Sequence, residues 1–199
     1  FNVTDPTAPT ITLNTPVNRS NTSSINVSFN YTATDNFYSY LNCSVFVNGT
    51  RNVTNSSVVG GSPTITTISG FVEGNYIWNV SCNDTSGNIN VTVARTFTVD
   101  TSSPLFNTLT TIPSSEINLD PNSNITLLGN ITDNVTGIDT VVMQYKLSND
   151  TLYTNLSNPG FVYVKSTYNI SFIVTRNGTY NLRLWANDSA GNPAYSNLV

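Results

Sequence analysis

Apolar and polar residues alternate with a period of two along most of this sequence of 199 residues. One example is the run in which Ile25, Val27, Phe29 and Tyr31 are separated by single polar residues. This pattern predicts strands with one buried face, because side chains i and i+2 lie on the same side of a strand. No stretch has the spacing of an amphipathic helix, so we expect an all-β protein.

Turn-forming residues divide the chain into short, regular segments. Gly, Pro, Asn and Asp interrupt the Thr-, Val-, Ile-, Tyr- and Phe-rich stretches at intervals of roughly 8–12 residues, which is the spacing expected of a β-sandwich. The segments predict about seven strands in each half of the chain.

The chain is an internal duplication. The motif Asn-Asp-Thr-Ser-Gly-Asn at residues 83–88 returns as Asn-Asp-Ser-Ala-Gly-Asn at 187–192, and the landmarks upstream of each copy follow the same order. We therefore predict two tandem domains, joined by a polar linker that ends in Pro104. The predicted boundaries are 1–8 for an N-terminal strand and linker, 9–100 for domain 1, 101–104 for the linker and 105–199 for domain 2.

Several motifs resemble those of a known group of proteins. They are Phe-Thr-Val-Asp at 97–100 followed by Pro104, the two Asp-x-x-Gly-Asn turns, and Leu-Asn-Cys-Ser at 41–44 with Val-Ser-Cys-Asn at 80–83. They are similar to tandem immunoglobulin-like domains of prokaryotic, archaeal-type cell-surface and extracellular filament glycoproteins. The resemblance implies two immunoglobulin-like sandwiches, but such a scaffold specifies function poorly. The second half departs from the first at Ala186, which stands where the first half has Cys82.

The composition excludes several classes of function. Charged residues make up 9% of the chain, against ~25% in ordinary soluble domains, and the net charge is −4. Only seven Lys and Arg are present, so we expect no nucleic-acid partner. The chain has no His, the usual general base, and no apolar run that would span a membrane. We therefore expect that it is not an enzyme and has no catalytic cofactor.

The strongest chemical signal is the N-glycosylation motif Asn-x-Ser/Thr, which occurs about twenty times where composition would give roughly eight. In a strand both acceptor residues share the exposed face, while the residue between them points inward. We predict that covalent N-glycans replace charge as a solubilising coat outside the cell; the alternative is chance in an Asn- and Thr-rich chain. The predicted sites are Asn2, Asn18, Asn21, Asn26, Asn30, Asn42, Asn48, Asn52, Asn55, Asn79, Asn83, Asn90, Asn124, Asn130, Asn134, Asn149, Asn155, Asn169, Asn177 and Asn187.

The two cysteines of the chain, Cys43 and Cys82, fall on the inward phase of two predicted strands. These strands would be neighbours in one sheet, so the pair predicts a disulfide within a sheet, suited to an oxidising extracellular compartment. Two buried thiols are the alternative.

Aspartates recur at equivalent places in the two halves, in the linkers and in two turns of each domain. Clustered oxygen ligands suit Ca²⁺, but Asp is also a common turn residue that binds its own backbone, and both interpretations stay open. The two predicted sets are Asp5, Asp35 and Asp84, and Asp100, Asp133 and Asp188.

The aromatic residues indicate both structural and contact roles. Tyr76 and Tyr180 resemble the tyrosine at the corner of an immunoglobulin-like sandwich. Each of the two Trp residues lies in a predicted strand. The alternation places Trp78 on the inward face of its strand and Trp185 on the outward face of the other, beside Arg183. Because this outer face lacks glycosylation motifs, we predict that it makes a protein contact. The residues of the predicted face are Gln144, Lys146, Arg183 and Trp185.

The ends of the sequence suggest how units assemble. The predicted last strand of domain 2 is shorter than that of domain 1. Phe-Asn-Val-Thr-Asp at 1–5 is similar to Phe-Thr-Val-Asp at 97–100 if one inserted residue is allowed. We predict that residues 1–5 of one unit complete the sheet of the preceding unit, either between separate subunits or within a longer tandem-repeat polypeptide. The predicted subunit contacts are Phe1, Val3, Tyr195, Leu198, Val199, Arg183 and Trp185.

These features together favour a structural unit of a heavily N-glycosylated extracellular filament or surface array, with itself as its partner. The first alternative is a cell-surface adhesin or carbohydrate-binding module that uses exposed aromatic residues such as Trp185 and Phe46.

Overall fold

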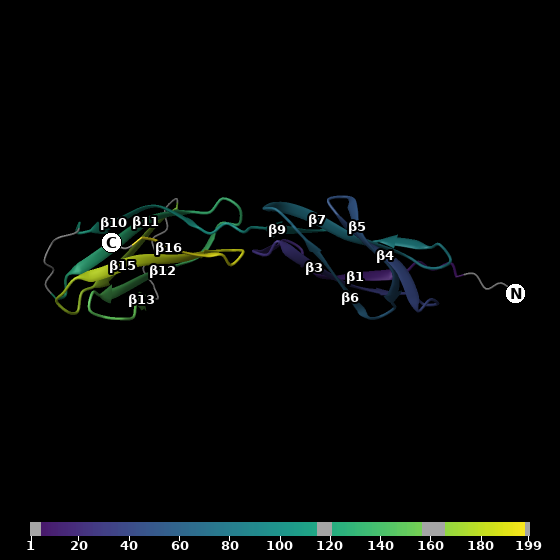
Figure 1. Cartoon of the computed structure of the whole chain (residues 1–199), viewed down its shortest axis with the longest axis horizontal. Helices are drawn as coiled ribbons and strands as arrows, with labels where there is room; N and C mark the ends of the chain where they lie inside the picture. Colours follow the sequence, from purple (N-terminus) through teal and green to yellow (C-terminus); the bar gives the residue numbers. More distant parts are fainter. Residues whose placement is uncertain (1–4, 115–120, 157–165, 198–199) are drawn as a thin grey trace. The chain divides into compact units, whose positions relative to one another are not determined.

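The computed structural model describes residues 5–114, 121–156 and 166–197. These residues form strands and turns with no helix, which confirms the predicted all-β class. The described part of the chain therefore contains no helix that could cross a membrane. The chain divides into two compact units, Phe1–Thr101 and Ser102–Val199 (Figure 1).

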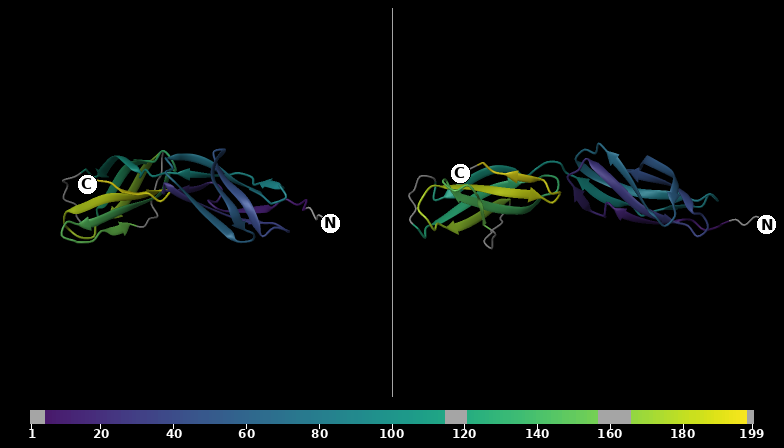
Figure 2. Two further views of the ribbon diagram at one scale, coloured as in Figure 1. Left: turned by 45° about the vertical axis from the view of Figure 1, so that its right-hand side comes forward. Right: turned by 60° about the horizontal axis from the view of Figure 1, so that its bottom comes forward.

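The first unit is a sandwich of two sheets that face each other (Figures 1 and 2). One sheet has the order β1-β3-β6, and the other has the order β2-β9-β7-β4-β5, with β8 also paired to β7. The strands are β1 (Thr10–Thr15), β2 (Ser20–Thr22), β3 (Asn26–Thr34), β4 (Tyr40–Val47), β5 (Thr50–Val59), β6 (Pro63–Ser69), β7 (Gly74–Asn83), β8 (Ile89–Val91) and β9 (Arg95–Val99).

The first unit has nine described strands rather than the seven predicted. The opening segment is divided, because β1 pairs antiparallel with β3 in one sheet and β2 pairs parallel with β9 in the other. The closing segment is divided as well, since β8 and β9 pair with different parts of β7. The alternation of apolar residues indicates which face of a strand is buried. It does not indicate which strand a segment pairs with, so it could not predict these divisions.

The second unit has seven described strands, in sheets of order β10-β11-β14 and β13-β12-β15-β16. It shares with the first unit the central pair of antiparallel strands, since β12 pairs with β15 as β4 pairs with β7. The strands are β10 (Leu105–Ile112), β11 (Asn124–Thr132), β12 (Ile138–Leu147), β13 (Thr154–Leu156), β14 (Thr167–Ile173), β15 (Tyr180–Asp188) and β16 (Pro193–Tyr195).

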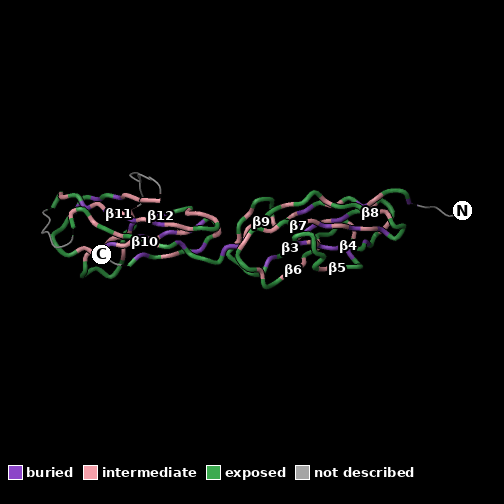
Figure 3. The backbone as a smooth tube through the Cα atoms, turned by 90° about the horizontal axis from the view of Figure 1, so that it is seen from above, coloured by how far each residue is buried: buried purple, intermediate pink, exposed green. Residues whose placement is uncertain are grey.

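Each unit has its own hydrophobic core between its sheets, and buried positions follow the strands (Figure 3). In the first unit, the ring of Phe29 meets Trp78 at 5.1 Å and Phe97 at 5.7 Å between centroids, both edge to face. In the second unit the core includes Leu127, Met143 and Leu184. The alternation predicted from the sequence is confirmed in β3 from Val27 onward. Ile25 is the exception, because it precedes β3 and is 48% exposed.

Candidate functional site

The predicted disulfide is confirmed. Cys43 and Cys82 are bonded to each other, and they are directly opposite residues of the neighbouring strands β4 and β7. Both are buried in the core of the first unit, so the alternative of two reduced thiols is wrong. At the equivalent position of the second unit Val141 lies opposite Ala186, an apolar pair in place of the bridge.

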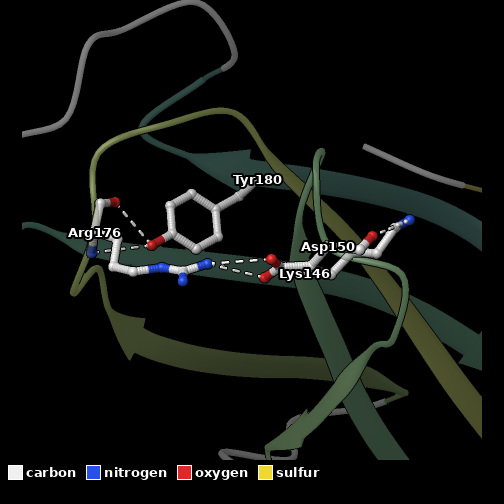
Figure 4. Close-up of polar contacts among 4 residues, drawn as sticks. All are labelled: Lys146, Asp150, Arg176 and Tyr180. Atoms are coloured by element: carbon white, nitrogen blue, oxygen red, sulfur yellow. Dashed lines mark hydrogen bonds and ion pairs between the residues drawn. The ribbon is translucent and has the colours of Figure 1, made fainter.

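Both predicted corner tyrosines make the expected hydrogen bond. The hydroxyl of Tyr76 donates to the carbonyl of Val72, and that of Tyr180 donates to the carbonyl of Arg176, each at 2.9 Å. Arg176 also forms an ion pair with Asp150 at 3.0 Å, and the Lys146 ammonium donates to the Asp150 carbonyl (Figure 4). This ion pair is exposed and contributes little to stability. The corner is a structural feature of both units.

The Asp-x-x-Gly-Asn turns are built alike in the two units. In the first, the backbone and side-chain amides of Asn88 donate to the two carboxylate oxygens of Asp84 at 2.8 and 2.6 Å. In the second, Asn192 donates to Asp188 in the same way, at 2.9 and 2.7 Å. Burial alone would raise the pKa of Asp84, but hydrogen bonds from Asn88 and from the following backbone amides outweigh it and lower the pKa. Asp84 is therefore held as a carboxylate.

The turns after β3 and β11 use aspartate in a second way. The Oδ1 atom of Asp35 accepts from the backbone amides of Phe37 and Tyr38, both at 2.9 Å. The Oδ1 atom of Asp133 accepts from the amides of residues 135, 136 and 137. The predicted turn role is thus confirmed for these aspartates, but it occupies only one oxygen of Asp35.

Asp5, Asp35 and Asp84 come together in the first unit, as predicted. One carboxylate oxygen of each lies within 4.8 Å of one from each of the others. Asp5 is 6% exposed and Asp84 is 3% exposed. The Oδ2 atoms of Asp5 and Asp35 are buried and have no hydrogen-bond partner. We call these three residues the aspartate cluster.

Two hydrogen bonds hold the backbone around the aspartate cluster. The side-chain amide of Asn88 donates to the backbone carbonyl of Asp5 at 2.8 Å. The hydroxyls of Tyr38 and Ser86 are 2.7 Å apart and join the turn after β3 to the turn after β7. The cluster is therefore fixed by contacts that leave the two Oδ2 atoms unused.

The other predicted set is distributed over the two units. Asp100 belongs to the first unit, where it is buried and its amide donates to the carbonyl of Thr22. Asp133 and Asp188 belong to the second unit, in turns equivalent to those of Asp35 and Asp84. That these three residues bind Ca²⁺ stays a prediction.

Most of the described asparagines of the glycosylation motifs are exposed. Among the described residues none of these asparagines is buried, thirteen being exposed and six partly buried. In β3 the middle residue Val27 is buried between exposed Asn26 and Ser28, as the strand geometry predicted. Asn2 lies outside the described residues.

The edge of β15 is a second candidate site. In the first unit β9 pairs with β7 from Gly74 to Trp78, and its Phe97 ring stacks on Tyr76 at 5.2 Å. In the second unit β16 pairs only with residues 185–187 of β15. Tyr180–Leu182 of β15 corresponds to the part of β7 that pairs with β9. Within the described ranges no strand pairs with these residues on the side opposite β12. We call Tyr180–Leu182 the open edge.

The predicted contact face on β12 and β15 contains a cluster of cations and aromatic rings. The guanidinium of Arg183 lies 3.9 Å from the ring centre of Tyr153 and 4.4 Å from that of Tyr195. Its Nε donates to Gln144 at 2.7 Å. Trp185 lies between buried Leu184 and Ala186 and is itself half-buried on the outer face, in its predicted phase. A protein contact at this face stays a prediction, and Leu198 and Val199 lie outside the described residues.

Comparisons with known proteins agree with the fold. No family model matches the sequence. No curated protein was found to be similar. Among solved structures, the fibronectin(III)-like modules of Clostridium thermocellum CbhA match with 13% identity and a TM-score of 0.55, covering 96% of this chain and 92% of theirs.

Two further structures have lower scores. The FN1–FN3 domains of chicken CNTN1 match with 12% identity and a TM-score of 0.44, covering 90% of this chain and 63% of theirs. The immunoglobulin domains 1–4 of Sidekick-1 match with 14% identity and a TM-score of 0.47, covering 95% and 47%. The match to the CbhA modules, with the higher TM-score, supports a fold of tandem fibronectin-III-like sandwiches. At these identities the likeness concerns the fold alone.

Proposed function

We propose that this chain is a structural unit of an N-glycosylated extracellular filament or surface array, in which units join by strand complementation. The open edge of β15 carries this proposal. At the equivalent edge of the first unit, the backbone of β7 pairs with β9. An unpaired strand edge accepts a strand from another unit, because its backbone amides and carbonyls need hydrogen-bond partners. The occupant we propose is residues 1–5 of another unit.

The first unit indicates what the complementing strand requires. In β9, Phe97 and Val99 are buried in the core, while Thr96 and Thr98 lie on the outer side. The sequence Phe-Asn-Val-Thr-Asp at 1–5 offers the same order of an aromatic residue, a valine and an aspartate. Residues 1–4 lie outside the described residues, so this match rests on sequence. Either a separate subunit or the next repeat of a longer polypeptide could supply the strand.

Replacing both Phe1 and Val3 with Ser is expected to abolish assembly into oligomers, because the complementing strand would lose the side chains that enter the core. Light scattering and electron microscopy of the full chain would measure this loss. Thr4→Ser is the matched control, because residue 4 lies in the opposite phase of the same segment and the change keeps the glycosylation motif at Asn2, and it should assemble normally.

Hydrogen exchange distinguishes complementation from other modes of association. In assembled protein the amides of Tyr180–Leu182 that face the open edge should be protected, and in the double variant they should exchange faster. Assembly of the double variant at the wild-type level would contradict the proposal. Denatured, deglycosylated chains near 21.6 kDa would indicate separate subunits, and much longer chains would indicate tandem repeats.

We also propose that most of the glycosylation motifs are occupied. The exposed strand faces carry these asparagines where other proteins carry Lys and Glu, so glycans would supply the polar surface. Peptide mass spectrometry is expected to find glycan at most of them. Asn107 and Asn122 are the internal controls, because both are exposed but lie outside the motif, and they should be unmodified. Occupancy of fewer than about a third would contradict a solubilising coat.

The alternative, an adhesin or carbohydrate-binding module, receives less support. Phe46 and Trp185 were its predicted contact residues, but both are half-buried, and Arg51 lies over the Phe46 ring at 5.6 Å. Aromatic faces that bind sugars need to be open. Our proposal also includes no catalytic role, since the chain has no His, the usual general base.

A further inference from the structure

The aspartate cluster has a feature that its turns do not explain. Asp5 is 94% buried, and its Oδ1 atom accepts from the amide of Thr7 at 2.9 Å, as in an ordinary turn. Its Oδ2 atom is buried with no partner, and so is that of Asp35. A buried carboxylate oxygen without a hydrogen bond is costly, and a second one beside it adds repulsion between like charges.

Within the described part of the chain, no Lys or Arg forms an ion pair with the aspartate cluster. The ion pair found among the described residues joins Arg176 to Asp150, both in the second unit. Asn88 donates a hydrogen bond to each carboxylate oxygen of Asp84, so this carboxyl group is held in place beside the other two. Three carboxylates held together in this way need a positive ligand.

We propose that the aspartate cluster binds one Ca²⁺ ion, with Asp5, Asp35 and Asp84 as its protein carboxylate ligands. Ca²⁺ takes six to eight oxygen atoms at about 2.3–2.6 Å, so oxygens on opposite sides of the ion are about 4.8 Å apart. The carboxylate oxygens of the cluster lie within this distance of one another. Because each comes from a different segment, before β1, after β3 and after β7, the ion would join three parts of the first unit.

Other common metal ions fit the cluster less well. Zn²⁺ and most transition metals favour His and Cys ligands, but the chain has no His and both of its cysteines are in the disulfide. Mg²⁺ requires near-ideal octahedral geometry at about 2.0–2.1 Å and usually keeps several waters, with only one or two carboxylates. A site with three convergent carboxylates therefore favours Ca²⁺.

Thermal unfolding of the full chain tests the proposal. Extracellular calcium modules bind with Kd on the order of 10⁻⁴–10⁻³ M, so about 10 mM CaCl₂ should lower the unfolding constant of the first unit roughly 10- to 100-fold relative to EDTA. The melting temperature should rise accordingly, and equal MgCl₂ should raise it less. Isothermal titration with CaCl₂ gives the affinity directly.

Asp35→Asn is the informative variant, because its remaining carbonyl oxygen can still accept the two turn amides while the negative charge is removed. Without Ca²⁺ this variant should be at least as stable as the wild type, since the repulsion is reduced; with Ca²⁺ it should be less stable. Asp139→Asn is the control: it changes the same charge at an exposed position of the second unit and should leave the calcium response unchanged.

Two results would overturn the proposal. One is an equal melting temperature of the wild-type first unit in CaCl₂ and in EDTA, with circular dichroism showing that it is folded in both. The other is an undiminished calcium response in Asp35→Asn, which would place the ion elsewhere. Asp5 is also the last residue of the segment proposed to fill the open edge of β15, but Asp35→Asn changes no residue of that segment. A lost calcium response in this variant and a failure of strand complementation are therefore distinguishable.

Discussion

Replacing Cys43 and Cys82 together with alanine is expected to lower the free energy of unfolding of the first unit by about 4 kcal/mol. The bond joins residues separated by 39 positions, and it restricts the unfolded chain more than the folded one. The loss is a large share of the stability of a domain of this size, which is about 5–15 kcal/mol. Denaturant unfolding followed by the fluorescence of buried Trp78 would measure it.

The second unit provides the control for this experiment. At the equivalent position it has Val141 opposite Ala186 and no bond, so its transition should not move when the cysteines are replaced. Wild-type protein treated with reductant should lose about the same stability as the double variant. A loss below about 1 kcal/mol would contradict the argument and would mean that the unfolded state gains little freedom when the bond is absent.

The fold could be predicted from the sequence to a large extent because its determinants are local and repeated. Alternation along β3 indicates which face is buried, and the inward phase shared by Cys43 and Cys82 indicates that the two can meet. The corner tyrosines follow from Gly-x-Tyr at both strand openings. For the alternation and the tyrosines, the duplicated half provides a second test of the same interpretation, whereas the cysteine pair occurs in the first half alone.

Pairing and tertiary contacts could not be predicted in the same way. The division of the opening segment into β1 and β2 depends on which sheet each part joins, and the alternation of residues is compatible with either sheet. Gly129 is another example, in the interior of β11, where an added Cβ would collide with the side chain of Leu184. The sequence shows a glycine in a strand, but the residue that requires it is 55 positions away.

The aspartate cluster lies between these two cases. The recurrence of Asp in the turns made a cation site a reasonable hypothesis, but the same pattern fits ordinary turns. In the structure the two roles fall on different atoms of Asp5 and Asp35, since Oδ1 binds the turn backbone and Oδ2 does not. The sequence could not separate these roles, because both oxygens belong to one side chain. The contacts of each oxygen in the structure separate them.

Phe97→Ala is expected to lower the free energy of unfolding of the first unit by about 3–5 kcal/mol, since it removes a fully buried aromatic ring and leaves a cavity. The Phe97 ring is 2% exposed and contacts three others, those of Phe29, Phe71 and Tyr76, with centroids 5.2–5.7 Å away. Through these contacts the side chain of Phe97 closes the core of the first unit. We therefore expect β9 to contribute side-chain packing in addition to backbone hydrogen bonds. Denaturant unfolding measures the loss.

Thr98→Ala is the matched control in the same strand. Its hydroxyl donates to Asn75 on the outer face, so the change should alter stability by no more than about 0.5–1 kcal/mol. Equal losses in the two variants would mean that β9 contributes through its backbone alone. The proposed complementing strand would then need no aromatic residue at Phe1. A large loss confined to Phe97→Ala would instead support the idea that the second unit gains a comparable contribution when the open edge of β15 is filled.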